Sequence, residues 1–88
     1  MDYEIPEEVK IIVNTTRDFV RRELDPIAES VEIQGRIPTD IVVKMKELGY
    51  FGLRIPEIFG GGGLSTLGYV MVLEELSKPH KAFWSLIY

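Results

Sequence analysis

Apolar residues recur at three- and four-residue steps through the first third of the chain, the spacing that one face of an α-helix shows. The series starts just after Pro6 and two acidic residues, which are favoured at a helix N-terminus. The pattern predicts one long helix that bends near Pro26, where a backbone donor is lost, and stops at Gly35. Its expected inward face consists of Val9, Ile12, Val13, Thr16, Phe19, Val20 and Leu24.

A second periodic series begins at Pro38 and ends before Gly49, since glycine takes the positive φ that closes a helix at little cost. Phe51 and Leu53 are expected to follow as core residues. The inward face of this second helix is predicted to contain Ile41, Val42, Met45 and Leu48.

A third helix is predicted from Thr66 to about Lys78, with Ser65 as its N-cap. It is apolar nearly all round, which is typical of a helix that is covered on several sides. Pro79 ends it, and a fourth apolar helix, residues 82–88, is cut off at the last residue. The pattern therefore predicts an all-α fold, an up-and-down helical bundle-like domain of three helices plus a truncated fourth, spanning residues 1–88.

The segment between the second and third helices contains four consecutive glycines, Gly60 to Gly63. Because Pro56 disfavours helix at the preceding residue, Leu53 to Ile55 is expected to be extended. Successive glycine N–H groups can bind phosphate, but no Lys-Ser/Thr pair follows and the dinucleotide spacing of glycines is missing. We interpret the glycines as a tight structural turn that lets helices approach.

Composition excludes several classes of function. The 88 residues include 14 acidic and 10 basic side chains, a net charge of −4, without the clustered basic face of a nucleic-acid-binding protein. The chain has no cysteine, so it has no disulfide, thiolate nucleophile or zinc-thiolate site. Its apolar runs are too short for a membrane span. The acidic start, MDYEIPEEVK, lacks a signal-peptide pattern, and we expect a cytoplasmic protein.

Three titratable residues near the end of the third helix are candidates for chemistry. His80 has lysines beside it and no acid close in sequence to orient it as a general base. We expect it to be a surface histidine near a helix start. Of Glu74 and Glu75, we expect one to face solvent and the other to form a structural pair with an arginine or lysine.

The stretch GLRIPEIFGGGGLSTLGYVMVLEELS, preceded by IPTDIVVKMKELGYF, resembles the N-terminal helical domain of the acyl-CoA dehydrogenase family. Members of that family carry a Leu-Gly pair, an Ile-Pro-Glu, an aromatic residue before a glycine cluster, and a helix ending in Glu-Glu-Leu. The resemblance extends from about Val9 to Leu76, and it contains no catalytic residue.

The resemblance implies a parent enzyme that oxidises an acyl-CoA to its 2,3-enoyl product. In the family a carboxylate base removes the α-proton, FAD accepts the β-hydride, and an electron-transferring flavoprotein takes the electrons. Family members are commonly dimers or tetramers, so a homo-oligomer is expected. The family's middle β domain and C-terminal helical domain are absent from these 88 residues. We therefore expect an incomplete fragment that is inactive alone and holds no stable FAD.

The family also suggests a substrate-binding surface, since its helix after Glu-Glu-Leu lines the acyl-chain pocket. An ungapped carry-over places Trp84, Ser85 and Tyr88 on the pocket side, and their spacing puts them on one helix face. The alternative is that they are plain core residues. Members commonly have small residues where this chain has Ser77 to Lys81, and bulky Trp84 would narrow a pocket, so chain-length preference is not carried over.

Two other classes of protein remain open from the sequence. One is a stand-alone helical interaction module that docks through Phe83, Trp84 and Tyr88. The other is an acyl carrier protein, which is also small, acidic and helical. That class needs an Asp-Ser-Leu at a helix start, and no serine here follows an aspartate.

Overall fold

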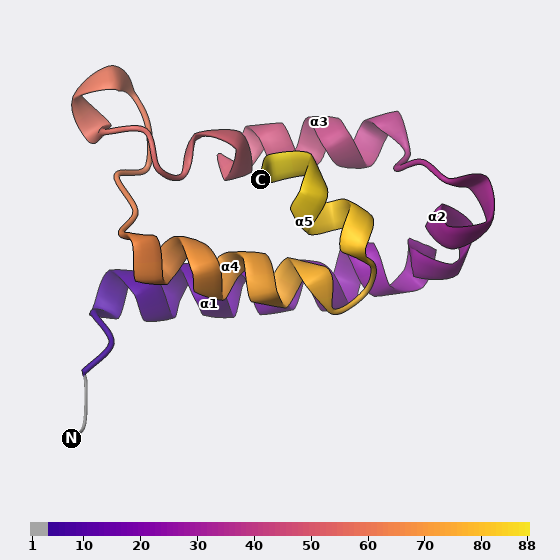
Figure 1. Cartoon of the computed structure of the whole chain (residues 1–88), viewed down its shortest axis with the longest axis horizontal. Coiled ribbons are helices and arrows are strands. Elements are labelled where there is room, and N and C mark those ends of the chain that lie inside the picture. The colour runs from indigo at the N-terminus through magenta and orange to yellow at the C-terminus, as the bar shows by residue number, and fades with distance from the viewer. Residues whose placement is uncertain (1–3) are drawn as a thin grey trace.

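The described part of the chain, residues 4–88 of a computed structural model, is built from helices without a strand. Residues 1–3, part of the acidic N-terminal segment, lie outside it. The predicted all-α class is confirmed. The α-helices are α1 (Glu7–Phe19), α2 (Ala28–Gln34), α3 (Thr39–Glu47), α4 (Thr66–Ser77) and α5 (Lys81–Ile87) (Figure 1).

The helices follow an up-and-down order. Helix α3 runs back against the direction of α1, α4 again runs in the direction of α1, and α5 turns back once more (Figure 1). Helix α4 packs against both α1 and α5. The molecule measures 41 × 33 × 19 Å, and its shortest dimension is about two helix diameters. In such a thin body a single core layer leaves many apolar side chains at the surface.

The predicted long first helix is interrupted at Pro26, as expected, and is divided into α1 and α2. A π turn, Val20–Leu24, and a 3-10 turn, Asp25–Ile27, lie between them. Proline has no N–H and its ring crowds the carbonyl four residues earlier. The N–H of Asp25 instead reaches the carbonyl of Val20, five residues back, which is the π pattern. Gly35, at φ 71°, ends α2.

The core draws on every helix. The inward face predicted for the first helix lies inside or against it, including Thr16, which is fully buried although polar. The buried apolar residues are Val9, Val13, Phe19, Val20, Leu24, Val31, Ile41, Met45, Tyr50, Leu53, Val72, Leu76 and Phe83.

The residues around the end of α3 correct two core predictions. Gly49 closes the helix at φ 87°, as predicted, and a 3-10 turn follows at Tyr50–Gly52. This turn changes the direction of successive side chains. Tyr50 is consequently 1% exposed, while Leu48 and Phe51, both predicted to be inward, are 45% and 40% exposed.

The segment Leu53 to Ile55 was expected to be extended, and that prediction is wrong. Leu53 has helical angles, φ −55° and ψ −40°. The carbonyls here accept hydrogen bonds from the glycine segment: Gly63 N–H bonds Ile55 at 2.8 Å and Leu64 N–H bonds Leu53 at 2.7 Å. The turn at Leu53 and Arg54 is closed by the Ile55 N–H, which bonds the Gly52 carbonyl at 3.1 Å.

The glycine cluster is a structural turn, as interpreted from the sequence, but its close neighbour is this segment rather than a helix. A Cβ atom on Gly61 would lie 2.2 Å from the carbonyl oxygen of Ile55. No side chain fits at that distance, so the close approach of the two backbones requires glycine at this position.

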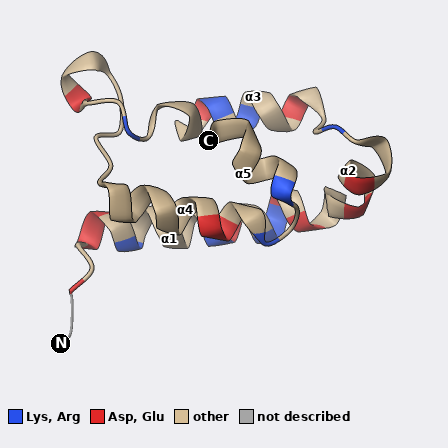
Figure 2. Cartoon of the chain, viewed as in Figure 1, with Lys and Arg blue, Asp and Glu red and all other residues tan. Residues whose placement is uncertain are grey.

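Helix α4 begins where predicted, with the Ser65 Oγ accepting a hydrogen bond from the Gly68 N–H at 3.1 Å. It carries charge only in its C-terminal half (Figure 2). Leu67 and Val70 are 53% and 52% exposed. Cover on several sides was predicted for this helix, and within residues 4–88 its main packing partners are α1 and α5.

Candidate functional site

Helix α5 carries the residues that the sequence assigned to substrate binding. Phe83 is fully buried and anchors the helix in the core. With about 100° between successive residues, Trp84, Ser85 and Tyr88 lie on the side of the helix away from Phe83. The three residues therefore share one face of the helix, and their role in substrate binding stays a prediction.

Trp84 and Tyr88 contact each other on this face. Their ring centroids are 5.2 Å apart in a T-shaped arrangement, a favourable geometry for aromatic pairs. Trp84 also packs against the core, whereas Tyr88 is 79% exposed. The pair thus forms an aromatic surface at the edge of the core, which we call the α5 aromatic face.

Ser85 lies beside this pair and is exposed. Its hydroxyl donates a hydrogen bond to the Lys81 carbonyl at 3.0 Å. The proton of the hydroxyl is therefore used within α5, and the side chain presents a small surface rather than a free donor.

The other interpretations of these aromatics are partly corrected. Phe83 is fully buried, so it is not available as one of the docking residues predicted for an interaction module. Trp84 combines partial burial with an exposed edge, and Tyr88 is largely outside the core.

His80 fixes the beginning of α5. Its Nδ1 accepts a hydrogen bond from the Ala82 N–H at 3.0 Å, and its Nε2 pairs with a carboxylate oxygen of Glu32 in α2. The His80 side chain is 17% exposed. It does lie at a helix start, but the expected surface histidine is a half-buried cap with an acidic partner that is distant in sequence.

The end of α5 is held by α4. The Tyr69 hydroxyl donates to the Ile87 carbonyl at 3.1 Å. The guanidinium of Arg54 lies 5.6 Å from the centre of the Tyr69 ring and also donates to the Thr66 hydroxyl at 3.0 Å. Side chains from other elements thus hold both ends of the helix that carries the α5 aromatic face.

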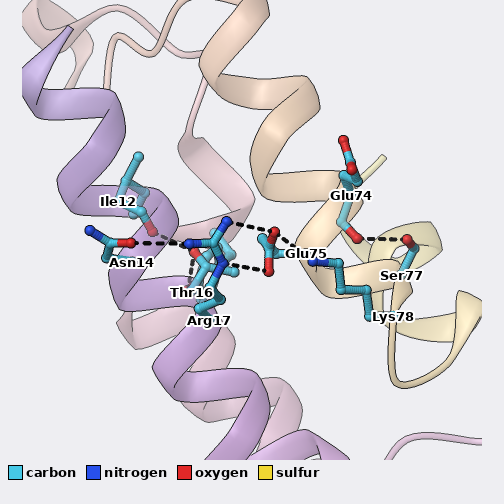
Figure 3. Close-up of polar contacts among 9 residues, drawn as sticks. Ile12, Asn14, Thr16, Arg17, Glu74, Glu75, Ser77 and Lys78 are labelled. Atoms are coloured by element: carbon cyan, nitrogen blue, oxygen red, sulfur yellow. Dashed lines mark hydrogen bonds and ion pairs between the residues drawn. The ribbon is translucent and has the colours of Figure 1, made fainter. Parts of the chain in front are cut away.

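Glu75 forms the structural pair that the sequence suggested (Figure 3). Its carboxylate accepts from Arg17 of α1 at 3.2 and 3.3 Å and from Lys78 at 2.9 Å. Burial raises the pKa of Glu75, but the hydrogen bonds from Lys78 and Arg17 outweigh it and hold the pKa below its ordinary value. Glu74, the neighbouring glutamate, is exposed, as predicted for one of the two residues.

A second polar link ties α1 to the turn after α3. The Thr16 hydroxyl donates to the Ile12 carbonyl at 2.7 Å and lies 2.8 Å from the Tyr50 hydroxyl. Since the Thr16 proton is already used, the Tyr50 hydroxyl donates to Thr16. Burial raises the pKa of Tyr50.

A hollow of about 660 Å³ lies beside the glycine segment, between the start of α1 and the end of α3. The N–H groups of residues 61–64 are all bonded to backbone carbonyls of residues 52–56. They therefore do not point into the hollow as a phosphate-binding loop would. Two carboxylates, those of Glu8 and Glu57, and one cation, Lys46, also border it, so its charged lining is acidic in balance.

Every buried side-chain nitrogen or oxygen within residues 4–88 has a hydrogen-bond partner. That part of the chain also holds no group of three metal-ligating side chains. Each helix of residues 4–88 is too short or too polar to span a bilayer.

The fold and the site together describe an all-α domain whose last helix carries an aromatic face. The family model described as the N-terminal domain of acyl-CoA dehydrogenase matches residues 6–87, and the chain belongs to that family. This establishes the resemblance seen in the sequence and does not favour a stand-alone interaction module or an acyl carrier protein.

Named relatives agree with the family model. The short-chain specific acyl-CoA dehydrogenase of Sus scrofa mitochondria is 41% identical over 85% of this chain, and the 3-(aryl)acrylate reductase of Clostridium sporogenes is 38% identical over 82%. A probable acyl-CoA dehydrogenase of Bacillus subtilis is 36% identical over 89%. The matches cover 18–20% of these relatives, so the chain spans about a fifth of their length.

Sequence reasoning missed the two contacts that join distant segments. Glu32 and His80 are 48 residues apart, and Thr16 and Tyr50 are 34 apart. Histidine is not one of the residues preferred as an N-cap, and nothing in the sequence identifies its second partner. Thr16 was identified as an inward residue, and a buried hydroxyl needs a partner, yet Tyr50 was not expected in the core.

Proposed function

We propose that this chain is the N-terminal domain of an FAD-dependent acyl-CoA dehydrogenase and that α5 forms part of the wall of its acyl-chain pocket. The single observation that carries the proposal is the α5 aromatic face, Trp84 and Tyr88 at 5.2 Å, within a domain of this family. An apolar surface on a firmly held helix is what a fatty acyl chain packs against.

The role of each residue in the wall follows from its contacts. Trp84, supported by the core, would contact the chain of the acyl group, and Tyr88 would extend that surface. Ser85 would contribute a small side chain that leaves room beside Trp84, since its hydroxyl is bonded to Lys81.

The catalytic base of the whole protein is proposed to lie outside this chain. Glu75 is held as a carboxylate by Arg17 and Lys78, and a carboxylate stabilised by two cations is a poor proton acceptor. Glu74 belongs to the same short stretch but is exposed.

The whole protein is proposed to interconvert an acyl-CoA and its 2,3-enoyl product, with FAD accepting the hydride when bound. Family membership supports FAD, a homo-oligomer and an electron-transferring flavoprotein as partner. These 88 residues alone are expected to be inactive and free of flavin.

The first test is the intact mass of the native gene product. We expect a mass several times the 10.1 kDa of this chain and, in the purified protein, a flavin spectrum that is bleached by a saturated acyl-CoA. A native product of 10.1 kDa, or a full-length protein without flavin, would overturn the proposal. Saturated and unsaturated thioesters are both assayed, because one relative is named a reductase.

The second test addresses the wall itself. In the full-length protein, Trp84→Ala is expected to change the KM for acyl-CoA and its dependence on chain length. Leu86→Ala is the matched control, since Leu86 lies on the same helix, about half a turn away from Trp84. Equal effects of the two substitutions would argue against a wall at the α5 aromatic face.

A further inference from the structure

The histidine before α5 connects that helix to α2. Its Nδ1 accepts the Ala82 N–H at 3.0 Å, and its Nε2 meets the carboxylate of Glu32. A nitrogen that accepts carries no proton, so the proton of the neutral ring is on Nε2 and is donated to Glu32. The contacts therefore define one tautomer of His80.

We propose that His80, in this Nε2–H tautomer, is a positioning residue for the acyl-pocket wall, because it fixes the start of α5 against α2. The wall part of this inference rests on the proposed function above. The contact of His80 with Ala82 and Glu32 does not, and it is measured separately.

Helix α5 needs such support because it has only seven residues, and isolated helices of that length are unstable in water. The first N–H groups of a helix also lack partners within it. His80 satisfies two of them, since its ring accepts from Ala82 and its carbonyl accepts from Phe83 at 3.2 Å. Trp84 follows within the first turn, so a shift of the cap moves Trp84 directly.

Histidine is suited to this position because it can accept from a helix and donate to a second element at once. The usual caps serine, threonine and aspartate would reach the Ala82 N–H but are too short to reach α2 as well. The ring is also sheltered at 17% exposure, while Glu32 is 72% exposed. The bond to Ala82 therefore lies at the sheltered side of the ring, and the pair with Glu32 lies toward solvent.

The contact itself is tested on the full 88-residue chain. We expect the imidazole nitrogen signals to report the Nε2–H tautomer by NMR. His80→Ala should speed amide exchange at Ala82 by about fivefold, the size expected for the loss of a helix cap. His80→Asn should restore most of the protection, since asparagine caps helices well.

Substitutions at Glu32 separate the two halves of the contact. Glu32→Gln retains an acceptor for the Nε2 proton and should leave the tautomer unchanged. Glu32→Ala removes that acceptor and should lower the population of the Nε2–H tautomer. Glu29→Ala is the matched control, an exposed acid on the same helix. An Nδ1–H tautomer, or equal Ala82 exchange in the wild type and His80→Ala, would overturn the proposal.

The effect on the wall is tested in the full-length holoenzyme. Loss of a binding surface that serves substrate and transition state alike raises KM and leaves kcat unchanged. We expect His80→Ala to raise the KM for acyl-CoA about fivefold, in line with the loss of the cap. His80→Asn, which caps the helix but is too short to reach α2, should reverse only part of this rise.

The two proposals fail in different ways. If NMR confirms the Ala82 contact in the wild type but the KM of His80→Ala is unchanged, the positioning role is overturned and the proposed function stands. A flavin-free full-length protein overturns the proposed function, and the positioning role with it, whatever the NMR of the contact shows.

Discussion

The pair of helices α1 and α4 and the glycine segment after α3 are held in place by opposite means. Between α1 and α4 the contacts are made by side chains, with Leu76 fully buried and Glu75 bonded to Arg17. In the glycine segment the contacts are between backbones, while Ile58 and Phe59 are 85% and 75% exposed. Side-chain chemistry should therefore control stability in the first region, and backbone geometry in the second.

The largest effect is expected where a core side chain is removed from the helix pair. Leu76→Ala should lower the free energy of unfolding by about 2–5 kcal/mol, through lost burial and the cavity that remains. Leu67→Ala, on the same helix but 53% exposed, should cost less than about 1 kcal/mol. Thermal unfolding followed by circular dichroism measures both, and similar losses would contradict the assignment of the core.

The backbone of the glycine segment should be almost as sensitive. Gly61→Ala places a methyl group 2.2 Å from the Ile55 carbonyl oxygen, and the forced displacement should cost about 2–4 kcal/mol. Gly52→Ala is the matched control, because its methyl group would meet the Ile55 side chain at an ordinary 3.8 Å. If urea titrations show the two variants to be equally stable, the close backbone approach is refuted.

The buried hydroxyl pair gives an asymmetric prediction. Thr16→Val leaves the buried Tyr50 hydroxyl without its acceptor and should cost about 1–3 kcal/mol. Tyr50→Phe removes only the donor, because Thr16 still donates to Ile12, and should cost about 1 kcal/mol. The reverse order in denaturant unfolding would show that the hydroxyl proton points the other way.

The same contrast explains how far the fold could be predicted. Helical periodicity identified α1, α3 and α4, because each has one face whose burial is repeated over several turns. It failed at Phe51, where the 3-10 turn after Gly49 shifts the phase of the side chains, and at Leu48, where α3 ends. It failed again at Leu53, because the hydrogen bonds that hold this residue come from Leu64, eleven positions later.

The candidate site was predictable only in part, for a related reason. The face shared by Trp84 and Tyr88 follows from spacing on a helix, and the structure reproduces it. The contact between His80 and Glu32 depends on how the chain folds back on itself, which spacing does not encode. A cluster of four glycines announces a turn, but only tertiary contacts show that Gly61 is the one without room for a side chain.

A smaller effect is expected at the ion pair between α1 and α4, and it depends on pH. The pKa of Glu75 is lowered in the folded chain, so its contribution is present above the ordinary pKa of a glutamate and is lost as pH falls through the lowered value. Glu75→Gln should cost about 1 kcal/mol near neutrality, since both cationic partners are largely exposed.

The pH profile distinguishes this pair from general acid unfolding. The difference in unfolding free energy between wild type and Glu75→Gln should shrink as the pH falls through the lowered pKa of Glu75, where the wild-type carboxylate takes up a proton. Glu74→Gln serves as the control for the loss of one exposed charge. A constant difference across the acid range would mean that Glu75 is not stabilised as a carboxylate.

The smallest effect is expected at the tip of the glycine segment. Ile58→Ser should change the unfolding free energy of the 88-residue chain by less than about 0.5 kcal/mol, because a side chain that is 85% exposed loses little burial. The same substitution in the full-length protein sharpens the comparison. A stability loss of about 1 kcal/mol or more there would show that another part of the protein covers Ile58, so that the backbone holds this segment in shape while its side chains bind elsewhere.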